Sequence, residues 1–139
     1  MRRPATKPFA LAVLLVPALH LGIFYGLFYA GATILMLPAL AGLFGLPCHI
    51  LLGIPAMYVA ARFWGTRILV FALAGLVAGV ASPLVIWAQI SLILGEALSP
   101  GIAINLGWSF GCLFGAGWGA AVGVLYHALN RALPRRGDQ

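Results

Sequence analysis

Residues 68–95 read ILVFALAGLVAGVASPLVIWAQISLILG and contain no formally charged side chain. Two more stretches, 8–61 and 97–130, are also free of charge, so uncharged sequence covers most of the 139 residues. A helix needs roughly 20 apolar residues to cross the hydrocarbon core of a bilayer, which is about 30 Å thick. Each stretch is long enough for at least one crossing, and the sequence therefore predicts a helical membrane protein.

The overall composition supports the same fold class. Hydrophobic residues make up 63% of the chain and charged residues only 7%, with a mean hydropathy of +1.08. A soluble domain carries roughly a quarter charged residues, and a membrane β-barrel alternates polar and apolar positions. Neither pattern is present, so we expect an all-α, polytopic membrane protein.

The basic residues indicate how the chain is oriented. The net charge is +6, and all eight basic residues fall into three clusters. If two spans separate successive clusters, every basic residue lies on one membrane face, which the positive-inside rule makes cytoplasmic. Both termini are then cytoplasmic, and the charge serves as an anchor to anionic lipid headgroups and not as a nucleic-acid surface. The predicted anchors are Arg2, Arg3, Lys7, Arg62, Arg67, Arg131, Arg135 and Arg136.

This arrangement predicts one four-helix transmembrane domain over residues 1–139, built from two hairpins. The second span carries several prolines and glycines, so the sequence leaves open whether it is continuous, bent or partly re-entrant. Basic usage is seven arginines to one lysine, which we interpret as a GC-rich bacterial genome and hence a multi-pass protein of the inner membrane. The predicted spans are about 9–31, 35–61, 68–94 and 101–129.

Glycines recur every four residues in the fourth predicted span, at Gly107, Gly111, Gly115, Gly119 and Gly123. Glycine is a poor helix former, and in membranes such spacing favours close contact between helices. The pattern resembles the glycine zippers of some oligomeric channels and rotor rings. It predicts packing against the first or third span, where Gly75 and Gly79 have the same spacing, or alternatively contact with another subunit.

Two histidines, His20 and His49, are the main candidates for a polar or cofactor site. If the first two spans form a hairpin, rises of 1.5 Å per residue place both rings at similar depth. We expect interhelical hydrogen bonds there; proton handling and axial ligation of haem are the alternatives. Cys48 and Cys112 do not form a C-x-x-C pair and are expected to be buried thiols. No other cofactor and no metal site is predicted.

No catalytic group of residues stands out. The only carboxylates are Glu96 and Asp138, and the only lysine is Lys7, so the membrane spans hold no acid–base pair. The chain also lacks the intramembrane carboxylate of small four-span multidrug exporters. Its one-sided basic residues do not fit the dual topology common in those exporters and in small fluoride channels. We therefore do not expect an enzyme.

The preferred interpretation is a non-catalytic accessory or structural subunit that acts through glycine-rich helix packing. Its partners would be membrane lipids and other transmembrane helices, either in a homo-oligomer or in a larger complex. A homo-oligomeric channel or transporter protomer is the first alternative, and a haem-binding subunit using His20 and His49 is the second. Interhelical hydrogen bonds could come from Gln89, Ser91, Asn105 and Ser109.

Overall fold

The structure, a computed structural model, describes residues 6–33, 36–95 and 99–133, and these residues form helices and short connections with no strand. Four helical segments are long and apolar enough to cross a membrane, which confirms the predicted fold class. The candidate membrane spans among the described residues are Thr6–Tyr29, Gly42–Trp64, Ile68–Ile93 and Gly107–Ala132.

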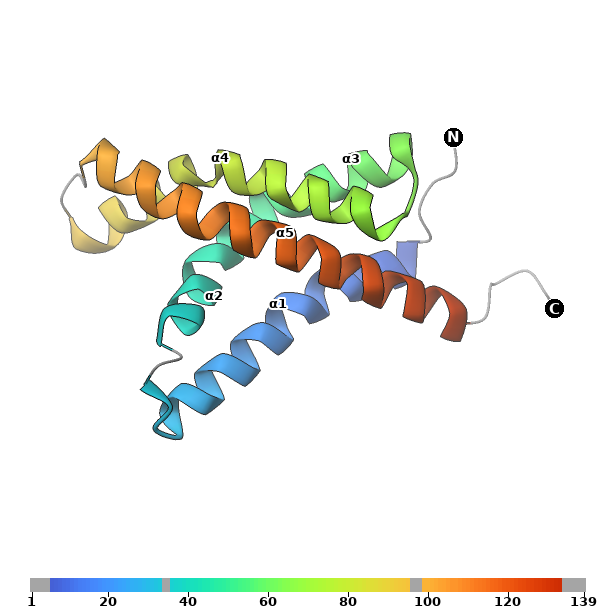
Figure 1. Cartoon of the computed structure of the whole chain (residues 1–139), viewed down its shortest axis with the longest axis horizontal. Coiled ribbons are helices and arrows are strands. Elements are labelled where there is room, and N and C mark those ends of the chain that lie inside the picture. The colour runs from blue at the N-terminus through green and yellow to red at the C-terminus, as the bar shows by residue number, and fades with distance from the viewer. Residues whose placement is uncertain (1–5, 34–35, 96–98, 134–139) are drawn as a thin grey trace.

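The first segment, α1 (Thr6–Tyr29), has buried residues only in its first half. Its buried residues all fall between Pro8 and Pro17, and none lies in 18–29. Pro17 lies inside the helix and cannot donate a backbone hydrogen bond to the carbonyl of Val13, four residues earlier. The second half of α1 runs away from the other long helices (Figure 1).

The second segment is continuous but consists of three consecutive helices, α2 (Met36–Cys48), the π-helix η2 (His49–Gly53) and α3 (Ile54–Trp64). Pro55, at the start of α3, has no N–H to offer the preceding turn. The wider turn of η2 ends there, with the N–H of Ile54 bonded to the carbonyl of His49. Figure 1 shows that α2 and α3 run in different directions. The span is therefore bent at η2.

The third and fourth segments, α4 (Ile68–Leu94) and α5 (Pro100–Ala132), lie side by side over most of their lengths (Figure 1). Gly95, with φ of 68°, ends α4 in the left-handed conformation that glycine adopts readily. At the other end of α4, Gly65 has φ of 91° and allows the tight turn from α3. The two helices thus form a long antiparallel pair.

The ends that carry basic residues lie together. The start of α1, the α3–α4 turn and the end of α5 all lie toward one end of the molecule (Figure 1). Lys7, Arg62, Arg67 and Arg131 belong to these segments and are exposed. The other predicted anchors, Arg2, Arg3, Arg135 and Arg136, and the carboxylates Glu96 and Asp138 lie outside the described residues.

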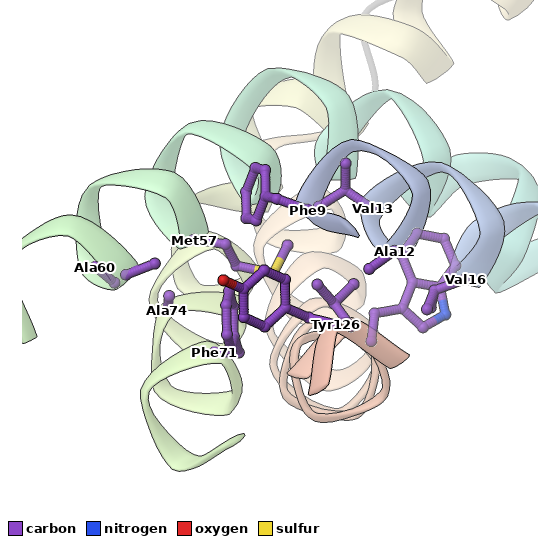
Figure 2. Close-up of a cluster of buried hydrophobic side chains, with 12 residues drawn as sticks. Phe9, Ala12, Val13, Val16, Met57, Ala60, Phe71, Ala74 and Tyr126 are labelled. Atoms are coloured by element: carbon purple, nitrogen blue, oxygen red, sulfur yellow. The ribbon is translucent and has the colours of Figure 1, made fainter. Parts of the chain in front are cut away.

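The main hydrophobic core lies toward this basic end and joins α1, α3, α4 and α5 (Figure 2). Phe71 and Val122 are fully buried at its centre, and Met57 is almost so. Lipid chains are as apolar as these side chains, so the core is stabilised by close van der Waals contact more than by exclusion of water. Its buried members are Phe9, Ala12, Val13, Val16, Met57, Ala60, Ala61, Phe71, Ala74, Trp118, Val122 and Tyr126.

Candidate ligand-binding site

An apolar cavity of about 250 Å³ lies where the second segment meets the α4–α5 pair. Met57 and Trp118 belong to both the core and the cavity wall, so the cavity begins where the core ends. Ligand pockets are mostly apolar hollows with a few polar groups, typically of roughly 300–1,000 Å³. The cavity is close to the lower end of this range. Its aromatic walls are Phe44, Phe110, Phe114 and Trp118, and its polar groups include Cys48, His49 and Ser82.

His49 supplies a hydrogen bond to the backbone carbonyl that Pro17 leaves unbonded in α1. Its Nε2 lies 3.0 Å from the carbonyl oxygen of Val13, and this carbonyl is the one that Pro17 leaves without its helical partner. Because a carbonyl only accepts, Nε2 must carry the proton and donate it. In membranes, backbone groups freed by proline survive where a neighbouring helix bonds them. The His49 side chain therefore links η2 to α1.

Ser82 has the same role within α4. Pro83 lies inside this helix and frees the carbonyl of Gly79, four residues earlier. The Ser82 hydroxyl donates to that carbonyl at 2.7 Å, and its oxygen lies 3.2 Å from the carbonyl oxygen of Gly107 on α5. Ser82 is 2% exposed, so this hydroxyl satisfies a carbonyl that water does not reach.

Trp118 connects α5 to both predicted histidines. Its indole Nε1–H donates to Nδ1 of His20 at 3.3 Å. Its ring centroid lies 5.3 Å from that of His20 and 5.1 Å from that of His49, in edge-to-face contacts. The structure therefore brings His20 and His49 to one tryptophan, and each imidazole uses one nitrogen in a hydrogen bond to another helix.

Three glycines of the second segment make room for these rings. A Cβ at Gly42 would lie 2.7 Å from Cδ2 of His20, and one at Gly45 would lie 3.4 Å from the Trp118 ring. At Gly53, a Cβ would lie 3.0 Å from Nδ1 of His49. Larger residues at Gly42 and Gly53 would push the imidazoles from their positions. The glycines that we expected only to bend this span therefore also admit its polar contacts.

The predicted glycine stripe of α5 lies against α4 of the same chain. A Cβ at Gly115 would collide with the carbonyl of Gly75, and one at Gly79 would collide with the carbonyl of Gly111. The remaining stripe residues behave likewise: Gly107 meets Pro83, Gly119 meets Phe71 and Gly123 meets Ile68. These glycines form the backbone contact between α4 and α5, and four of them also line the cavity: Gly75, Gly79, Gly111 and Gly115.

The remaining candidate groups are more dispersed. Cys48 is buried, with its thiol 3.5 Å from the carbonyl oxygen of Phe44, and Cys112 is half-buried; both are free thiols. Asn105 and Ser109 are exposed. Gln89 Oε1 and Ser91 Oγ are buried without a hydrogen-bond partner in the described part of the chain. Among the described residues, no group of three or more histidine, cysteine or acidic side chains could hold a metal ion.

Sequence reasoning missed Trp118, Ser82 and the acceptor at Val13. The prolines were the available signal, since Pro17 and Pro83 each free a carbonyl four residues earlier, at Val13 and at Gly79. Serine and histidine near such carbonyls are natural donors. Comparison with protein-family models, with curated proteins and with solved structures finds no match for this chain.

Proposed function

We propose that this chain is a small, non-catalytic accessory protein of a bacterial inner membrane. Its role is to hold a compact apolar molecule from the bilayer in the cavity between the second segment and the α4–α5 pair. The observation that carries the proposal is the cavity itself, about 250 Å³ in volume and lined by four aromatic rings with few polar groups.

The chemistry of the spans supports binding without reaction. No acidic side chain and no lysine occurs in the uncharged stretches that form the spans. The cavity's hydroxyl and thiol face backbone carbonyls, and no hydrogen bond to a histidine activates either of them in the described residues. Nucleophilic catalysis needs such an activating base. A bound molecule would therefore leave the cavity without having been chemically altered.

The basic end supports an orientation with both termini in the cytoplasm. Arg62, Arg67 and Arg131 are exposed, and the segments that carry them lie toward one end of the molecule (Figure 1). The positive-inside rule favours the cytoplasmic face for such an end. Each such residue adds about 1 kcal/mol of attraction to an anionic leaflet. The cavity then lies deeper in the bilayer, on the other side of the hydrophobic core.

The glycine-rich packing has a supporting role in this proposal. Because α4 already occupies the stripe within the chain, the stripe holds two walls of the cavity rigid and is not the surface for a partner helix. Partner helices would have to contact other exposed apolar faces, such as those carrying Leu14, Leu84 or Leu113.

Fluorescence quenching in lipid nanodiscs tests the proposal. Replacing Trp64, Trp87 and Trp108 with Phe leaves Trp118 as the sole tryptophan, at the cavity wall. A brominated apolar ring such as 4-bromotoluene quenches tryptophan on contact. We expect saturable quenching of Trp118; quenching that only rises linearly with the mole fraction in the membrane would contradict the proposal.

A matched pair of α4 variants gives the control. Ala78 lines the cavity and Ala81 is exposed. Ala78→Leu fills the cavity and should abolish saturable quenching, whereas Ala81→Leu should preserve it. Thermal unfolding of both variants shows whether each is folded. Equal quenching in two folded variants would place the guest outside the cavity.

A further inference from the structure

Nδ1 of His49, in the cavity wall, has no hydrogen-bond partner in the described part of the chain. His49 is 5% exposed, and its Nε2 proton is donated to the carbonyl of Val13. The neutral ring therefore carries a lone pair on Nδ1, which can only accept a hydrogen bond. No hydrogen bond to Nδ1 occurs among residues 6–33, 36–95 and 99–133. Ser82 and Cys48, by contrast, already donate to carbonyl groups.

The position of this nitrogen makes it available to a guest. Nδ1 lies beside Gly53, where an added Cβ would be 3.0 Å away, and both His49 and Gly53 line the cavity. Any side chain at residue 53 would cover the nitrogen. In an apolar cavity this acceptor gains a hydrogen bond only from a guest or from a water, and a water there would find few of the two to four polar partners that it needs.

The other walls favour a flat ring. Phe44, Phe110 and Phe114, together with Trp118, line the cavity, and aromatic rings pack favourably in offset-stacked or edge-to-face contacts. A guest that satisfies both features has an aromatic body and a hydroxyl group at its edge. An aliphatic chain would gain neither the ring contacts nor the hydrogen bond.

We propose that the cavity binds a compact aromatic alcohol, a phenol-type ring whose hydroxyl donates to Nδ1 of His49. This inference rests on the proposed function, because it names the chemical class of guest that the same cavity prefers. His49 then has two roles: its Nε2 donates to the Val13 carbonyl of α1, and its Nδ1 accepts the hydrogen bond from the guest's hydroxyl.

The test compares 4-bromophenol with 4-bromotoluene, in which a methyl group replaces the hydroxyl. Both are titrated at known membrane mole fractions into nanodiscs that contain the variant with Trp118 as its sole tryptophan. One net hydrogen bond corresponds to a preference of roughly three- to tenfold. We expect 4-bromophenol to reach half-saturation at a mole fraction lower by that factor.

The two roles of His49 are separated with Pro17. His49→Phe removes both nitrogens, and adding Pro17→Ala returns a helical N–H to the Val13 carbonyl. The double variant should therefore recover part of the lost stability but should bind both compounds equally. Pro17→Ala alone keeps Nδ1 and should keep the preference for the phenol.

The outcomes distinguish this inference from the proposed function. Saturable quenching by both compounds with equal half-saturation in the parent protein would overturn the phenol assignment and leave apolar binding intact. Saturable quenching by neither compound would overturn both. A phenol preference that persists in the double variant would show that His49 does not accept the hydroxyl, and would also overturn the assignment.

Discussion

The α4–α5 pair and the α1–α2 hairpin reach close packing by opposite means. Between α4 and α5, glycines bring backbone against backbone, as at Gly75 and Gly115. The hairpin and the adjoining η2 approach the pair through side chains, with Trp118 contacting His20 of α1 and His49 of η2. Residues of α1 beyond Pro17 have no buried side chain, whereas the pair is in contact over most of its length.

The difference shows two ways in which a helix in lipid can be held against its neighbours. Where backbones touch, packing depends on shape alone, and any side chain larger than hydrogen is excluded. Where proline breaks the hydrogen-bond ladder, packing also depends on a donor at one particular carbonyl. The first interface should therefore be sensitive to volume, and the second to hydrogen-bonding chemistry.

The largest effect is expected from Gly115→Leu, which forces the backbones of α4 and α5 apart. We expect a loss of more than about 3 kcal/mol in the free energy of unfolding, because rigid backbone cannot yield to the new side chain. Unfolding in mixed micelles measures it. Gly117→Leu is the matched control, since nothing lies within 4 Å of a Cβ there. Equal losses in the two variants would show that the α4–α5 interface is not specifically sensitive to side-chain volume.

Next in size is His49→Phe, which leaves the Val13 carbonyl unpaired in an apolar setting. We expect a loss of about 2 kcal/mol in unfolding free energy. In a Pro17→Ala background the loss should fall by about 1 kcal/mol, because α1 then bonds its own carbonyl. A double-mutant cycle measures this coupling. Zero coupling would show that His49 does not replace the hydrogen bond that Pro17 removes.

Ser82→Ala should have a smaller effect, about 1 kcal/mol, because its hydroxyl replaces a single hydrogen bond. The same unfolding measurement applies. Ser109→Ala, at an exposed position on α5, should change the stability by less than about 0.5 kcal/mol. If the two variants behave alike, the carbonyl of Gly79 does not depend on Ser82.

The smallest loss from a hydrogen bond is expected for Trp118→Phe, which retains an aromatic ring but deletes the donor to His20. The bond is long, at 3.3 Å, and interhelical hydrogen bonds in membranes average about 0.6 kcal/mol. We expect a loss near that value from the hydrogen bond, in addition to any change from the smaller ring. Trp118→Leu, which also removes the ring, should cost more; the opposite order would contradict the proposed ring contacts.

Much of the fold is predictable because it depends on composition. Uncharged stretches of sufficient length require spanning helices, and all four helical segments start and end within about three residues of their predicted limits. The direction of the bend in that span is not predictable, because Pro47 and Pro55 allow several arrangements. The π-turn at His49–Gly53 depends on what packs around it.

The candidate site could be predicted only in part. A similar depth for His20 and His49 follows from counting residues, but their common neighbour Trp118 comes from the fourth segment, whose rotation about its axis depends on the glycine contacts. Sequence also marks Pro17 as a helix breaker without indicating that the bond it removes is replaced from 36 positions away, by His49 on Val13.

The hydrogen bond from His49 to Val13 has a consequence for biosynthesis. During synthesis the first span leaves the ribosome before residue 49 does, so the Val13 carbonyl reaches the bilayer ahead of the donor that it will finally use. The first span can complete its backbone hydrogen bonding only after the second has joined it. Membrane insertion of this chain should therefore proceed by helical hairpins, and truncation before residue 49 should leave a span that integrates less efficiently than its hydropathy alone implies.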